Sequence, residues 1–214
     1  MAENGDTNFH HELNEAATLD DIKPLLYVNP LATNIRNKDG NNPVHIAMMN
    51  KVVKFNLTRA LLRASPYAAR ETNGNKDTPL HLAACNRSVT SDVIKALLHV
   101  NPSAANARNK YGNVLTHLAI SNEVIKVLGK YAPGTVGEKN GNTDTPLHLA
   151  LYKETIDLDV INALLQVNPS VMHVKNKYGN NPMHTAISNE EVRLDVIVAL
   201  IQIGPSTVGE RNKK

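Results

Sequence analysis

The chain has 214 residues, of which 20% are charged, a formal net charge of +3 at pH 7 and a single cysteine. The mild charge, with Lys and Arg spread along the chain, argues against a nucleic-acid partner, and no apolar run approaches the ~18 residues that a membrane span needs. One cysteine excludes an internal disulfide framework, and the first residues lack the apolar region of a signal peptide, so we expect an intracellular protein of the cytoplasm or nucleus.

Two predicted helices precede the part of the chain that repeats. Residues 9–17 have the character of a short helix. A second helix is predicted from near Asp21, which can cap it, because Pro24 is tolerated only in a first helical turn. We predict that residues 1–36 form an N-terminal capping helix pair, because the end of a stack of repeats exposes a face that a neighbour would otherwise cover.

From residue 37 onward a short motif recurs. Residues 77–83 read DTPLHLA, residues 144–150 are identical to them, 42–47 and 181–186 are looser copies, and 114–119 are a worn copy without the proline. The motif histidines, at intervals of 36, 36, 31 and 36 residues, are His45, His81, His117, His148 and His184. A fixed period of this size is the signature of stacked structural repeats.

Each repeat has the same predicted order of elements. A polar turn around a glycine leads to a first helix, which Thr78 or Thr145 can cap and in which proline takes the first position. A polar link and a second helix follow, and this helix ends just before a proline, at 29–30, 65–66, 101–102, 132–133, 168–169 and 204–205. The turns at 73–77 and 140–144 are expected to be two residues longer than the others. The first helix near Leu115 is expected to be short and less stable, because its repeat lacks the proline.

The repeats resemble ankyrin repeats from about residue 20 to the end of the chain, because the TPLHLA motif recurs together with a downstream helix such as VIKALL. The resemblance implies an all-α fold, an ankyrin-type helical solenoid of stacked antiparallel helix pairs with short β-turn fingers. Most repeats here have 36 residues, whereas the family has about 33. We predict one continuous domain in which the capping pair is followed by five repeats at about residues 37–70, 71–107, 108–137, 138–174 and 175–214.

A longer rhythm overlies the single repeat. Residues 109–113 recur as 176–180, and residues 134–140 recur nearly intact as 206–212, so the chain looks like a duplicated block of two repeats. The chain ends where another repeat could begin. Two explanations stay open: a partner covers that face, or the chain is truncated.

The sequence contains no recognisable active site. The motif histidines are expected to bond backbone groups of their own turn and of the next finger, because neighbouring repeats lie about 10 Å apart and cannot share one metal ion. Cys85 has only His81 near it on its helix and is expected to be a bystander. No glycine turn matches a phosphate-binding loop. We therefore predict that the protein is not an enzyme and binds no cofactor or metal.

The ankyrin resemblance implies a protein-binding surface on the concave face, made by the finger tips and the exposed ends of the first helices. Its residues in this sequence are Asp39, Asn41, Met49, Asn50, Asn75, Lys76, Cys85, Asn86, Tyr111, Asn113, Ser121, Asn122, Asn142, Thr143, Tyr152, Lys153, Tyr178, Asn180, Ser188 and Asn189. Tyrosines are frequent anchors of interfaces, but the rings of Tyr111 and Tyr178 could equally pack on the next finger.

We predict a non-catalytic protein–protein interaction scaffold or adaptor that binds a protein or peptide on this face. Its partners are one or more proteins, and we expect no nucleic acid and no membrane insertion. The alternative is a structural accessory subunit of a larger assembly, held through its terminal repeats.

Overall fold

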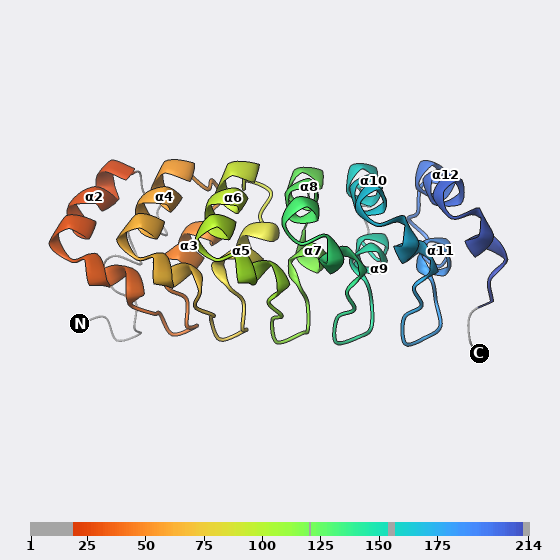
Figure 1. Ribbon diagram of the computed structural model, residues 1–214, viewed down its shortest axis with the longest axis horizontal. Helices are drawn as coiled ribbons and strands as arrows, with labels where there is room; N and C mark the ends of the chain where they lie inside the picture. Colours follow the sequence, from red (N-terminus) through yellow and green to blue (C-terminus); the bar gives the residue numbers. More distant parts are fainter. Residues whose placement is uncertain (1–18, 120, 154–156, 212–214) are drawn as a thin grey trace. The chain divides into compact units, whose positions relative to one another are not determined.

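The computed structural model describes residues 19–119, 121–153 and 157–211 (Figure 1). All regular structure in these residues is helical, which confirms the all-α prediction. The chain divides into two compact units, Met1–Lys110 and Tyr111–Lys214. The repeat boundaries and the single continuous domain stay predictions, and the predicted helix at 9–17 lies outside the described residues.

The N-terminal unit begins with α2 (Leu19–Val28), which corresponds to the second helix of a repeat and whose predicted first helix lies outside the described residues. Two helix pairs follow it. The pairs are α3 (Pro43–Met49) with α4 (Phe55–Ala64) and α5 (Pro79–Ala84) with α6 (Ser91–Val100). First helices pack on first helices and second on second, as α3 on α5, α2 on α4 and α4 on α6. In Figure 1 the second helices of this unit form one row, with the fingers projecting below the first helices.

The C-terminal unit repeats this arrangement three times. Its pairs are α7 (Leu115–Leu118) with α8 (Asn122–Tyr131), α9 (Pro146–Leu151) with α10 (Leu158–Val167), and α11 (Pro182–Ile187) with α12 (Leu194–Ile203). Here α7 packs on α9, α9 on α11, α8 on α10 and α10 on α12. The prediction that the first helix of the third repeat is short is confirmed, because α7 has only four residues.

Proline follows each second helix as predicted, and each of these prolines also starts a new short helix. A short 3₁₀ helix begins at each of these prolines: η1 (Pro30–Asn34), η2 (Pro66–Ala69), η3 (Pro102–Asn106), η4 (Pro133–Gly137), η5 (Pro169–His173) and η6 (Pro205–Gly209). A first helical position needs no N–H, so the residue that cannot continue one helix is well suited to start the next. No pattern in the sequence predicted these 3₁₀ helices.

The helix α2 differs from its prediction. It begins at Leu19 rather than near Asp21, so Pro24 lies inside the helix. Proline has no N–H to donate to the carbonyl of Asp20 one turn earlier. Both residues are exposed, so water can reach that carbonyl and the cost of the missing bond is reduced.

The predicted threonine cap is confirmed for Thr145 in α9. The hydroxyl of Thr145 accepts from the backbone N–H of His148 at 3.5 Å, and Thr78 occupies the same position in α5. In the third repeat Val114 takes this position, and its side chain has no acceptor. With neither a side-chain cap nor a proline, α7 is the shortest first helix among the described residues.

The five fingers have one length, so the prediction that the second and fourth are longer is wrong. Each begins at an asparagine, and the residue three positions later has a positive φ. These residues, with φ of 77°, 58°, 74°, 64° and 78°, are Gly40, Lys76, Gly112, Thr143 and Gly179. In the second and fourth fingers the glycine has moved two positions toward the N-terminus, to Gly74 and Gly141. The turn itself is not longer.

The displaced glycines allow close contact between neighbouring fingers. The N–H of Gly141 donates to the carbonyl of Tyr111 at 3.0 Å, and a Cβ on Gly141 would lie 2.8 Å from that oxygen. Gly74 meets the carbonyl of Asp39 in the same way, with an N–H to O distance of 2.9 Å. This contact requires glycine for space rather than for φ, so an odd finger and the even finger after it form a matched pair.

Thr143→Gly is expected to stabilise the protein by about 1 kcal/mol. A β-branched residue at positive φ is strained by about 1–3 kcal/mol, which outweighs the extra entropy of glycine in the unfolded chain. The Thr143 hydroxyl is also buried without a hydrogen-bond partner among the described residues. Urea unfolding measures the change. Asn142→Gly is the control, because Asn142 lies in the same turn without a positive φ and its replacement should destabilise; equal effects of the two would contradict the assignment of strain.

Candidate protein-binding surface

Asparagine side chains hold consecutive fingers together. The Nδ2 of Asn73 donates to Oδ1 of Asn41 at 2.9 Å, and Asn109 donates to the carboxylate of Asp77 at the same distance. In the C-terminal unit Asn140 donates to Asn113 at 3.0 Å, and Asn176 donates to Asp144 at 2.9 Å. The fingers are therefore cross-braced at their bases, which fixes the spacing of the side chains that they display.

A lysine braces each even finger to the odd finger that follows it. Lys177 Nζ donates to Oδ1 of Asn142 at 3.1 Å, and Lys110 Nζ donates in the same way to Asn75. These bonds alternate with the glycine contacts described above. The two-repeat rhythm of the sequence thus corresponds to two alternating kinds of contact between fingers.

Three motif histidines, His45, His117 and His148, tie their first helix to the next finger, as predicted. Nδ1 of His45 accepts from the backbone N–H of Asn42 at 3.3 Å, and Nε2 lies 3.0 Å from the carbonyl of Asp77. A carbonyl can only accept, so Nε2 carries a proton and donates it to this carbonyl. His117 and His148 repeat the contact, with Nε2 at 3.0 Å from the carbonyls of Asp144 and Asn180.

This environment disfavours the protonated imidazole. Burial lowers the pKa of His45 from 6.5 to about 4, against the smaller opposing effect of the bond to the Asp77 carbonyl. Burial also lowers the pKa of His148. Among the described residues, no group of three or more His, Cys, Asp or Glu side chains is arranged to hold a metal ion.

In the N-terminal unit the structure brings four predicted contact residues together. Met49, Asn50, Cys85 and Asn86 line one open hollow of about 360 Å³ between the ends of α3 and α5. Met48, Lys51, Leu82 and Arg87 complete its lining and were missed by the sequence analysis. The floor is largely apolar and two cations stand at its rim. Asp39, Asn75 and Lys76 are exposed on the fingers of the same unit.

Two predicted contact residues have structural roles instead. Nδ2 of Asn86 donates to the carbonyls of Met48 and Asn50, both at 2.8 Å. Asn189 makes the equivalent bonds to the carbonyls of Leu151 and Lys153, at 2.8 and 3.1 Å. Each amide closes the open end of the first helix in the preceding repeat, where carbonyls lack helical partners.

In the C-terminal unit three tyrosines are exposed on the finger side. The exposed fractions of Tyr111, Tyr152 and Tyr178 are 60%, 48% and 61%. The ammonium of Lys177 lies 5.1 Å from the centre of the Tyr178 ring, which holds that ring at the finger tip. The Tyr152 hydroxyl accepts from Asn176 at 3.0 Å and donates to Asp144 at 3.4 Å. Partial burial, and then the Asp144 carboxylate, raise the pKa of Tyr152.

The other predicted contact residues differ in accessibility. Asn41 is buried and braced by Asn73, so a partner cannot reach it, and it is removed from the predicted surface. Ser121 is half-buried and caps α8 through Val124. The side chain of Asn122 lies outside what the structure describes. Asn113, Thr143 and Asn180 are half-buried, whereas Asn142, Lys153 and Ser188 are exposed.

We call the exposed members of this set, within each unit, the finger-side face. They are Asp39, Met49, Asn75, Lys76 and Cys85 in the N-terminal unit, and Tyr111, Asn142, Tyr152, Lys153, Tyr178 and Ser188 in the C-terminal unit.

Stacked helix pairs with cross-braced fingers define a helical-repeat protein. A family model described as "Ankyrin repeats (3 copies)" matches residues 13–110, 51–134 and 116–208, and the chain therefore belongs to the ankyrin repeat family. Ankyrin repeats are generally protein–protein interaction modules and are typically non-catalytic.

A solved structure shares the fold. The ankyrin repeat domain of Bcl-3, described as a unique member of the IkappaB protein family, matches with a TM-score of 0.73 and 22% sequence identity, over 94% of this chain and 88% of that chain. At this identity the likeness shows the fold alone. A search of curated proteins finds no match. None of the helices in the described residues combines the length and apolar character needed to cross a membrane.

Acidification is expected to destabilise the protein through His45. Its folded pKa of about 4 lies below the unfolded value of 6.5, so between these values the unfolded chain binds a proton that the folded chain does not. Stability is therefore lost as pH falls from 6.5 toward 4, by about 3 kcal/mol in full. Urea midpoints from pH 7 to 5 measure the loss, and His45→Gln should have a shallower pH dependence. An imidazole NMR titration of His45 centred near 6.5 would contradict this assignment.

Proposed function

We propose that the protein is a non-catalytic scaffold or adaptor that binds a protein or peptide on its finger-side face. The observation that carries the proposal is the exposure of Tyr111, Tyr152 and Tyr178 on one side of a braced frame. Exposed tyrosines are disproportionately the anchors of protein interfaces, because one ring combines a large apolar area with a polar tip.

The bracing of the fingers supports this function energetically. Side chains that are already held in place lose little freedom when a partner binds, and about 0.5–1.5 kcal/mol is at stake for each mobile side chain. Tyr178 is held by Lys177, and Tyr152 is held by Asp144 and Asn176. We therefore expect a pre-ordered surface rather than one that folds around its partner.

The hollow at Met49 and Cys85 gives the N-terminal unit a part in the same function. Its apolar floor suits one aliphatic or aromatic side chain, and Lys51 and Arg87 can meet a carboxylate or a carbonyl beside it. The two units would contact one partner or two. No chemistry at Cys85 is required for this.

Replacing Tyr111, Tyr152 and Tyr178 together by alanine is expected to weaken partner binding by at least about tenfold, because each ring is expected to contribute more than 1 kcal/mol. The partner is the set of proteins recovered by affinity purification with the wild-type chain, and retention is compared between variants by quantitative mass spectrometry. Circular dichroism melting checks that the fold survives.

The chain supplies a matched control for this triple variant. Its other three tyrosines, Tyr27, Tyr67 and Tyr131, are also exposed but lie outside the finger-side face. Their joint replacement by alanine should leave the recovered proteins unchanged. Equal retention by the two triple variants would sink the finger-side assignment.

A specific observation favours the second candidate, a structural accessory subunit held through a terminal repeat. Helix α12 carries an exposed apolar stripe that includes Leu194, Val198 and Ile201. Ile201 is 41% exposed, whereas Leu165, at the same position of α10, is 2% exposed. The face that α10 uses to receive α12 is therefore left open on α12, where a helical partner could pack.

The two candidates are separated by one further variant. Leu194→Lys with Ile201→Lys is expected to remove the recovered partners if α12 holds the protein in an assembly, and to leave them in place if the finger-side face binds them. Both side chains are exposed, so the melting temperature should change little in either case.

A further inference from the structure

The six second helices can be compared position by position, because each has ten residues. The second position is acidic in every one except α4. The acids are Asp20, Asp92, Glu123, Asp159 and Asp195, and α4 has Asn56 instead. Acids at this end of a helix offset its dipole and can neutralise a cation one turn later.

The missing acid leaves the arginines of α4 unopposed. In α2 the carboxylate of Asp20 pairs with Lys23 at 3.2 Å, and in α6 Asp92 pairs with Lys95 at the same distance. On α4 the fifth and ninth positions are Arg59 and Arg63, and both are exposed. Neither forms an ion pair within the described residues.

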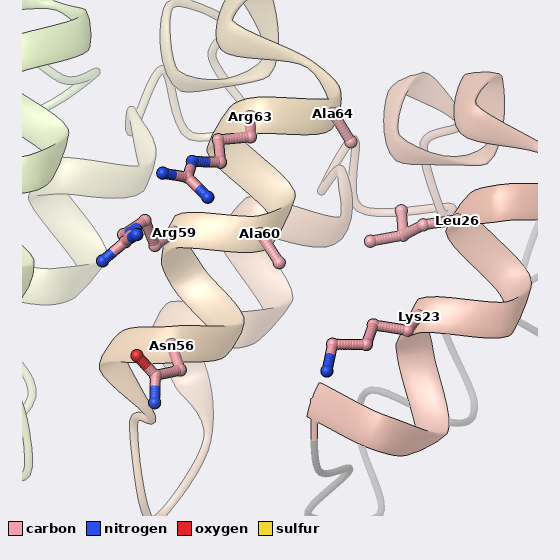
Figure 2. Close-up of a pocket in the computed structure, with 7 residues that line it drawn as sticks. All are labelled: Lys23, Leu26, Asn56, Arg59, Ala60, Arg63 and Ala64. Atoms are coloured by element: carbon pink, nitrogen blue, oxygen red, sulfur yellow. The ribbon is translucent and has the colours of Figure 1, made fainter.

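The same helix also leaves an apolar hollow beside these charges. The last position holds Ala64 on α4, where the other second helices have Val, Tyr or Ile. With Ala60 and Leu26, this small residue opens a hollow of about 520 Å³ between α2 and α4. In Figure 2, Lys23 and Leu26 point from α2 toward Ala60 and Ala64, whereas Arg59 and Arg63 extend from the opposite side of α4.

We propose that this hollow is a second docking site, for an acidic segment of a partner protein that crosses α4. One aliphatic side chain fills the space above Ala60 and Ala64. Carboxylates of the same segment reach Arg59 and Arg63, whose planar guanidinium groups bind carboxylates through paired hydrogen bonds. This surface lies on second helices and uses no residue of the finger-side face, so it is independent of the proposed function.

The chemistry favours an acidic peptide over a nucleic acid. A nucleic-acid footprint needs cations along a stripe, whereas Lys23 on one side and Lys95 on the other are both already paired with aspartates. The floor is apolar, which suits a side chain rather than a phosphate. Residues 1–18 of this chain, with four acidic residues and no Lys or Arg, are the competing occupant that an experiment must separate.

The test uses fluorescein-labelled ten-residue peptides with two glutamates four residues apart and a leucine between them, and a glutamine version of each. Fluorescence anisotropy with the full chain should show the glutamate peptides binding at least about tenfold more tightly, because hydrogen bonds between charged groups are stronger than those to a neutral amide. Arg59→Glu with Arg63→Glu should remove that preference. Ala64→Leu should weaken binding by filling the hollow without a change of charge.

The control variant is Lys126→Glu with Lys130→Glu, which reverses the charges at the same two positions of α8 and should leave binding unchanged. The triple tyrosine variant should also leave it unchanged. Equal binding of glutamate and glutamine peptides, or an equal loss in the control, would overturn the proposal. So would a tenfold gain on deletion of residues 1–18, or tighter binding of a single-stranded oligonucleotide of equal charge.

Discussion

The stack depends on one hydrogen bond that is made again in successive repeats, from a neutral imidazole to the backbone of the following finger. In the first helix the histidine occupies the third position, where its Nδ1 accepts the N–H of the capping residue. Its Nε2–H then reaches a carbonyl 32 residues further along, as from His45 to Asp77 and from His148 to Asn180. One side chain thus completes a helix cap and sets the register of the neighbouring repeat. Burial lowers the pKa of the ring despite the opposing effect of this bond, so the buried histidine makes the stack sensitive to acid.

The fixed register between neighbouring repeats makes the finger-side face suitable as a binding surface. Once the histidine has placed the next finger, asparagine amides brace the bases of the fingers and lysines or glycine contacts brace their tips. Polar side chains near the turns are consequently divided between two uses. Asn41 and Asn86 form hydrogen bonds between repeats, whereas the side chains of Tyr111 and Tyr178 stay exposed. Residues available for binding can therefore be identified only after the residues that brace the fingers have been excluded.

This division explains how far the sequence alone could predict the structure. Helix pairs, threonine caps, helix ends before proline and the short α7 were all predictable, because each depends on a local rule about which backbone groups lack a partner. The fingers were not, because glycine serves two purposes there. At Gly112 it permits a positive φ, whereas at Gly141 it permits a close approach and leaves the positive φ to Thr143. The buried state of Asn41 and the two bonds of Asn86 depend on the adjacent repeat, so no local pattern reveals them.

Because the repeats share one structure, each side chain can be compared with those at the equivalent position of the other repeats. A residue shared by the second helices, such as the acid at the second position, is explained by helix stability, since it offsets the dipole wherever it occurs. Helix stability does not explain a residue that differs from those at the same position of the other second helices. Replacing the acid by Asn56 removes about 0.3–1 kcal/mol of helix stabilisation and leaves Arg59 without an acidic side chain one turn earlier. Ala64 further reduces the contact between α2 and α4. Two departures, one that weakens the helix and one that weakens its packing, are gathered on one exposed surface and are better explained by a ligand than by the fold.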